Sequence, residues 1–178
     1  MKNIMKHGKK SKLGAAFFSA LVFLTALAFT MALSSCGGKD DETTKLNTAS
    51  DIYKHITTLA VFPKMEQPNS EDIEDYFGID LDRIKAYEVR LSSDATLADE
   101  IAVFELADEA YRVALVNILK QRLNRAANVA RDYSPEQYDI ILKSTVEEKG
   151  RFVFYVVNAK SESIVSELKK LIEDWPLK

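Results

Sequence analysis

The strongest constraint on this chain is an apolar run near its amino terminus. Nearly every side chain in residues 14–33 is apolar, and residues 1–13 before it contain five lysines and no acid. This is the layout of a secretory signal, because the positive end stays cytoplasmic while the apolar stretch enters the bilayer. About twenty apolar residues are also enough for a permanent membrane span. Length alone therefore leaves open both a cleaved signal and an uncleaved anchor.

The four residues that follow favour cleavage. Leu33, Ser34, Ser35 and Cys36 resemble the bacterial lipobox, in which a leucine and two small residues precede a cysteine. The resemblance implies peptidase recognition of residues 33–35, cleavage before Cys36, and a diacylglyceryl group on its thiol. Two acyl chains bind a bilayer firmly, at about 0.8 kcal/mol per buried methylene. We therefore predict a signal peptide over residues 1–35 and a lipid anchor on the extracytoplasmic face of the cell membrane.

The rest of the chain divides into a tether and one domain. Residues 37–47 are polar and begin with two glycines, so we expect residues 36–47 to form a flexible, lipid-anchored tether. Residues 48–178 are long enough for one domain with its own core. Beyond residue 35, 19 basic side chains stand against 27 acidic ones. This acidic balance argues against a nucleic-acid partner and against a second contact with anionic lipid.

Hydrophobic spacing predicts the elements of the domain. Alternation in residues 84–91 indicates a half-buried strand, and residues 152–157 are apolar on both faces, as in a central strand. Apolar residues at spacings of three and four indicate helices. The predicted helices are 48–60, with Thr48 or Ser50 as cap, 70–77, with Ser70 as cap, 108–131, 134–142 and 161–175; the predicted strands are 84–91, 100–106, 144–147 and 152–157.

This order predicts an α+β fold. Strands adjacent in sequence favour antiparallel pairing. We expect a mostly antiparallel sheet of about four strands, with helices packed mainly on one face.

Three stretches carry a resemblance to a known family. They are residues 98–104, Arg122 with residues 133–138, and residues 150–154. Together with the lipobox, their order resembles a family of bacterial lipoproteins catalogued as domain of unknown function 4358, over roughly residues 50–172. The resemblance implies a lipid-anchored extracytoplasmic domain and assigns no catalytic residue.

Structural roles are enough to explain these motif positions, and no catalytic role is needed. Asp99 and Glu100 stand at a strand entrance, where charge discourages edge pairing. Tyr133 is expected to pack over the helix start at Ser134, and Gly150 to serve a tight turn.

No catalytic, metal-binding or cofactor-binding constellation is predicted. Lipidation consumes Cys36, the only cysteine, and a serine triad needs a histidine base. The only histidine beyond the signal is His55, which flanks an apolar helical stripe and is expected at its solvated boundary. A single imidazole without a helical partner gives no metal motif.

Charged clusters have ordinary explanations as well. The helix dipole favours acids in a first helical turn, so a calcium site is not expected at the carboxylate cluster Glu71, Asp72, Glu74, Asp75, Asp80 and Asp82. Arg122, Arg125 and Arg131 are expected on a solvated helix face, with contact to an anionic partner as the alternative.

The predicted function is a non-enzymatic module that binds an envelope protein or a cell-wall component. The alternative is a small-ligand-binding or sensory lipoprotein, which would need a pocket between helices and sheet. A more remote alternative is a carboxylate-dependent hydrolase, which would need two carboxylates facing each other in a cleft. A large exposed apolar patch would favour the non-enzymatic binding module.

Overall fold

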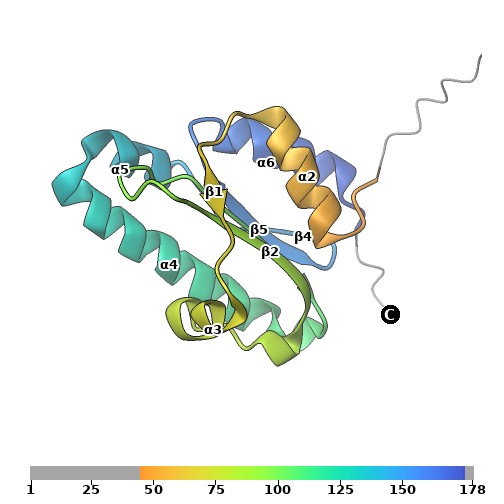
Figure 1. Cartoon of the computed structure of the whole chain (residues 1–178). Coiled ribbons are helices and arrows are strands. Elements are labelled where there is room, and N and C mark those ends of the chain that lie inside the picture. Colours follow the sequence, from red (N-terminus) through yellow and green to blue (C-terminus); the bar gives the residue numbers. More distant parts are fainter. Residues whose placement is uncertain (1–44, 175–178) are drawn as a thin grey trace, which may run out of the picture. The chain divides into compact units, whose positions relative to one another are not determined.

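The computed structural model describes residues 45–174, which belong to one compact unit (Figure 1). The predicted signal peptide, Cys36 and most of the predicted tether lie outside the described residues, as does Trp175. No helix within residues 45–174 combines the length and the hydropathy needed to cross a membrane.

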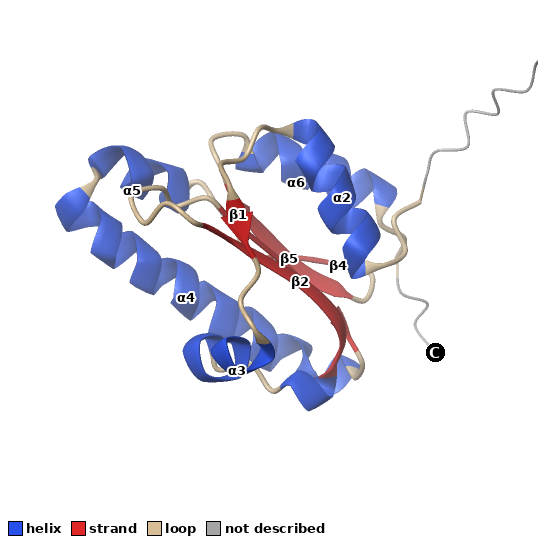
Figure 2. Ribbon diagram, in the orientation of Figure 1, coloured by secondary structure: helices blue, strands red, loops and turns tan. Residues whose placement is uncertain are grey.

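An antiparallel sheet of five strands forms the middle of the domain (Figure 2). The strand order is β1-β2-β3-β5-β4, so β3 is the central strand, and β5, which was predicted to be central, is an interior strand between β3 and β4. Strand β1 was not predicted, because two residues are too few to show alternation. The strands are β1 (Met65–Glu66), β2 (Ile84–Ser92), β3 (Glu100–Leu106), β4 (Glu147–Lys149) and β5 (Phe152–Val157).

The helices follow the predicted order with small shifts at their ends. Thr48 caps the first helix by accepting a 3.0 Å hydrogen bond from the Asp51 N–H. Asn69, and not Ser70, caps the second by accepting one of 2.8 Å from the Asp72 N–H. The helices are α2 (Ala49–Leu59), α3 (Ser70–Asp72), π-helix η1 (Ile73–Phe77), 3₁₀ helices η2 (Leu81–Arg83) and η3 (Glu109–Tyr111), α4 (Arg112–Tyr133), α5 (Pro135–Leu142) and α6 (Ser161–Leu171).

Helices cover both faces of the sheet, so the expectation that they pack mainly on one face is wrong (Figures 1 and 2). On β3, Ala102 and Phe104 join the core beneath α4, and Ile101 and Val103 join the core beneath α2 and α6. The predicted α+β class and the mostly antiparallel sheet are confirmed.

The polar face of β2 explains the wrong expectation. Glu88 and Arg90 alternate with apolar residues, which suggests a face open to water. In the structure the Arg90 guanidinium lies 2.8 Å from the Glu88 carboxylate and 4.6 Å from the ring centroid of Tyr53 on α2. The ion pair and the aromatic contact let a helix cover this charged strip.

The two ends of the sheet have different neighbours. At one end, buried Leu46 pairs with Ile172, close to the β4–β5 turn at Gly150. The packed chain thus begins two residues before the predicted domain start. Because Glu100 pairs with Val157 in antiparallel register, the β2–β3 loop at residues 93–99 lies at the other end.

Candidate functional site

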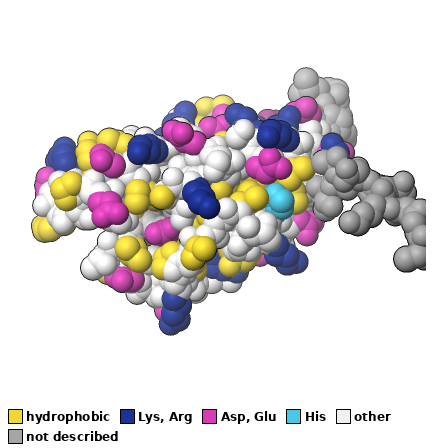
Figure 3. All heavy atoms as spheres, turned by 90° about the horizontal axis from the view of Figure 1, so that it is seen from above, with side chains coloured by type: hydrophobic (Ala, Val, Ile, Leu, Met, Phe, Trp, Pro, Cys, Tyr) yellow, Lys and Arg dark blue, Asp and Glu magenta, His cyan; other side chains and the backbone are white. Residues whose placement is uncertain are grey.

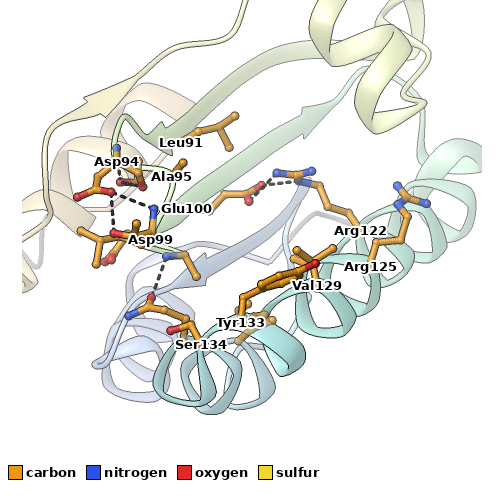
Figure 4. Close-up of a pocket in the computed structure, with 18 of the residues that line it drawn as sticks. Leu91, Asp94, Ala95, Asp99, Glu100, Arg122, Arg125, Val129, Tyr133 and Ser134 are labelled. Carbon is orange, nitrogen blue, oxygen red and sulfur yellow. Dashed lines mark hydrogen bonds and ion pairs between the residues drawn. The ribbon is translucent and has the colours of Figure 1, made fainter.

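A groove with a volume of about 850 Å³ lies at the end of the sheet remote from Leu46 (Figure 4). One wall is the β2–β3 loop, and the other is the carboxyl-terminal half of α4 with the start of α5. Tyr76 of η1 also lines the groove, next to Arg122, and Glu100 and Arg122 form its buried floor.

A buried ion pair forms the floor of the groove. The Arg122 Nε lies 2.6 Å from Glu100 Oε1, and its Nη2 lies 2.7 Å from Glu100 Oε2. Only 6% of Glu100 and 9% of Arg122 is exposed. The hydroxyl of fully buried Tyr155 on β5 donates a further hydrogen bond to Glu100 Oε1. Three elements are therefore joined at one carboxylate.

This pair corrects two expectations. Glu100 is not an exposed charge that protects a strand entrance, and Arg122 is not on a solvated helix face. Helical spacing could have placed Arg122 correctly, because it follows Leu119 by three residues and precedes Ala126 by four. The second signal for a buried Arg122 is a residue of opposite charge, Glu100, on the buried strand β3.

The groups around the floor of the groove determine the charge states of Arg122 and Tyr155. The Arg122 guanidinium lies 4.1 Å from the ring centroid of Phe77 and 4.9 Å from that of Tyr76. Burial alone would lower the pKa of Arg122, but the hydrogen bonds that Arg122 donates to Glu100 and the negative charge of Glu100 outweigh burial and raise that pKa. Burial, and then the negative charge of Glu100, raises the pKa of Tyr155 well above its ordinary value. The guanidinium stays charged and the phenol stays neutral.

Internal hydrogen bonds hold the β2–β3 loop in place. The Ala98 N–H donates to Gln137 Oε1 on α5 at 2.8 Å. The Asp94 carboxylate accepts from the Thr96 hydroxyl at 2.7 Å and from its N–H at 2.9 Å, and these bonds lower the pKa of Asp94. Asp99 Oδ1 accepts from Asn158 Nδ2 at 2.7 Å. The loop is therefore a preformed wall.

Apolar side chains surround the mouth of the groove. Tyr133 is 86% exposed, Tyr76 66%, Val129 65% and Leu97 36%. The expectation that Tyr133 packs over the helix start at Ser134 is therefore wrong. Exposed side chains of this size grouped around one concavity are typical of a contact surface.

The remaining candidate residues lie elsewhere or have structural partners. His55 is half-buried on α2 and does not line the groove, and its buried Nε2 has no hydrogen-bond partner among residues 45–174. Asp80 caps η2 by accepting from the Asp82 N–H at 3.1 Å. Arg131 pairs with Asp132 at 3.3 Å. Within residues 45–174, no three histidine or acidic side chains are grouped closely enough to hold a metal ion.

The surface charge is mixed. On the face drawn in Figure 3, basic and acidic side chains of the described residues lie interspersed with apolar ones.

Two of the three motifs that carry the family resemblance meet in the groove. Residues 98–100 come from the first, and Arg122, Tyr133 and Gln137 from the second. The third supplies Gly150 in the β4–β5 turn, where φ is +56° and an added Cβ would overlap the Glu173 carbonyl oxygen.

Comparison with known proteins gives one match. No curated protein and no solved structure matches the chain. The model of the family described as domain of unknown function (DUF4358) matches residues 60–158, more than half of the chain. This range contains every residue that lines the groove, from Tyr76 to Ile141. The chain therefore belongs to the DUF4358 family.

Proposed function

We propose that the protein is a non-enzymatic binding module of the cell envelope, lipid-anchored through Cys36, and that the groove is its binding site. The observation that carries the proposal is the grouping of exposed Tyr76, Val129 and Tyr133 around a preformed concavity with a buried, fully paired floor. Binding sites combine apolar contact area with a few fixed polar groups in this way.

The position of the groove supports an anchored role. The chain enters the domain at Leu46, beside Ile172, while the groove lies at the opposite end of β5. The six residues of β5 span about 20 Å at about 3.3 Å per residue. A membrane anchor attached ahead of Leu46 would leave the groove open to partners. The mixed surface charge supports a protein or cell-wall partner over a nucleic acid.

The carboxylates of the groove support binding over hydrolysis. Asp94, Asp99 and Glu100 each accept a hydrogen bond from a partner within the domain. A hydrolytic pair needs one carboxylate to hold a transferable proton and the other to face water or substrate. The second candidate, a small-ligand-binding or sensory lipoprotein, would use the same groove, whose volume lies within the range of ligand pockets.

Filling the groove tests the proposal. Ala130 lines it and is half-buried, so Ala130→Trp should occupy part of its volume. Val113 lies near the other end of α4 and is 71% exposed, so Val113→Trp is a matched control. We expect in-cell crosslinking and mass spectrometry to find a partner or wall fragment with the wild type and the control, and not with Ala130→Trp. An unchanged set of adducts in Ala130→Trp contradicts the proposal.

A further inference from the structure

We propose that the partner in the groove is a second copy of this chain, held by antiparallel packing of the two α4 helices across a two-fold axis at Val129. This inference rests on the proposed function, since it names the partner that the same groove binds.

A row of exposed side chains on α4 carries the inference. Arg125, Val129 and Tyr133 follow one another at intervals of four residues, so they form one ridge along the helix. All three are exposed and line the groove, and in Figure 4 they lie one after another along α4. The ridge is therefore accessible to a partner over its whole length.

The two ends of this ridge lack partners within the domain. Among residues 45–174, Arg125 has no ion pair and no aromatic contact, and the Tyr133 side chain has no hydrogen bond and no ring contact. Other arginines of the same helix differ, because Arg122 is held by Glu100 and Arg131 pairs with Asp132. The ridge thus offers an unpaired cation at one end and an unpaired aromatic ring at the other.

This ridge is complementary to itself in reverse. In one direction it presents a cation, an apolar side chain and an aromatic ring, and in the other direction the same three in reverse order. Two antiparallel ridges therefore place each Arg125 beside the partner's Tyr133, and Val129 beside its own copy at the axis. A two-fold interface makes every such contact twice, so one dimer gains two cation–aromatic contacts. A parallel arrangement would instead bring like guanidinium groups together.

The dimensions allow this packing. Ridges of residues four apart pack side by side when two helices cross at about 50°, with their axes about 8–10 Å apart. Ala126 and Ala130 flank Val129 and are small enough for this approach. The groove volume of about 850 Å³ leaves room beside the two alanines for the side chains of the second copy. From Arg125 to Tyr133 each ridge rises about 12 Å, at about 1.5 Å per residue, and Val129 lies midway, so both cation–aromatic contacts form together.

The other exposed apolar residue of α4 lacks this complementarity. Val113 is 71% exposed, but the residues four positions before and after it are Glu109 and Asn117. Glu109 already pairs with Arg112. Antiparallel packing centred on Val113 would therefore form no cation–aromatic contact, which makes this position a matched control.

A cysteine at the axis tests the geometry. Cα atoms lie about 2.3 Å from a helix axis, so axes about 8–10 Å apart leave two facing Cα atoms about 4–5 Å apart, close to the span of a disulfide. We expect Val129→Cys to give a disulfide-linked dimer when the purified full chain is oxidised in detergent micelles, and Val113→Cys to give none. Both variants retain Cys36, the only natural cysteine, so any disulfide through Cys36 would appear in both.

An exchange of the two ridge ends tests the complementarity. Sedimentation equilibrium of the full chain in detergent measures the dissociation constant of the dimer. Tyr133→Arg sets guanidinium groups against each other and should raise this constant roughly tenfold, because both cation–aromatic contacts are lost. Adding Arg125→Tyr to Tyr133→Arg restores both contacts in reverse order and should return the constant close to its wild-type value. Adding Arg131→Tyr instead should not, because Arg131 does not line the groove.

A disulfide at position 129 but not at 113, with restoration by Arg125→Tyr but not by Arg131→Tyr, supports the inference. A single chain at every concentration tested, equal disulfide yields at the two positions, or no restoration by Arg125→Tyr overturns it. A different crosslinked molecule that is lost in Ala130→Trp would in that case still support the groove as a binding site, so the two failures are distinguishable.

Discussion

The ion pair beneath the groove makes a quantitative prediction for Glu100→Ala. The substitution removes the acceptor of two hydrogen bonds from Arg122 and of one from Tyr155. It leaves a guanidinium that is 9% exposed and a phenol that is fully buried. Among the described residues, neither group has a second carboxylate as a partner.

The magnitude follows from burial. Removing one partner of a buried ion pair destabilises a protein by about 3–5 kcal/mol. A buried hydroxyl without an acceptor adds about 1–3 kcal/mol, and the two effects overlap because both groups face the same carboxylate. We therefore expect the free energy of unfolding to fall by about 4 kcal/mol. That is a large part of the 5–15 kcal/mol typical of a domain.

Urea denaturation followed by far-ultraviolet circular dichroism measures this loss. The control is Glu167→Ala, which breaks the exposed Glu167–Lys170 pair and should change stability by less than about 0.5 kcal/mol. The triple variant Glu100→Leu, Arg122→Met and Tyr155→Phe should recover most of the loss, because it leaves no unpaired buried charge. A loss below about 1 kcal/mol in Glu100→Ala, or no recovery in the triple variant, refutes the reasoning.

Three further predictions concern separate parts of the chain. Cys36→Ala should abolish lipid labelling and retain the unprocessed precursor, and unchanged labelling would contradict the lipobox. Gly150→Ala should lower the thermal midpoint more than Gly78→Ala, because both residues have positive φ but a Cβ clashes only at Gly150; equal shifts would argue against the clash. The raised pKa of Tyr155 means that above pH of about 10 the unfolded chain releases a proton that the folded chain keeps, so stability falls as pH rises. Tyr155→Phe should flatten this alkaline decline in urea titrations, and an equally steep decline would count against burial of a neutral phenol.

Most strands and helices could be predicted because their hydrophobic spacing is regular. The exceptions are β1 and β4 (Glu147–Lys149), which shares only residue 147 with the predicted strand 144–147. Strand β5 is apolar on both faces and lies inside the sheet, and α4 shows its buried stripe over many turns. The coverage of both faces could not be predicted, because Glu88 and Arg90 neutralise each other under α2. A spacing rule treats such a pair as two solvated residues.

The groove was harder to predict than the fold. It joins a loop, a helix and η1, and their proximity depends on long-range packing. Arg122 was misplaced because its charge was given more weight than its helical spacing. Asn69 was missed as a cap because Ser70, the next residue, is an equally good cap in sequence.

Site-specific photo-crosslinking in cells tests the central claim, that the groove is the binding surface, most directly. A benzophenone amino acid replaces Tyr133 at the mouth of the groove, or Val113 on the same helix outside it; both positions are exposed. The account predicts a discrete adduct from position 133 that is absent from position 113 and is lost when Ala130→Trp is added. Identical adducts from both positions, or none from position 133, would contradict it.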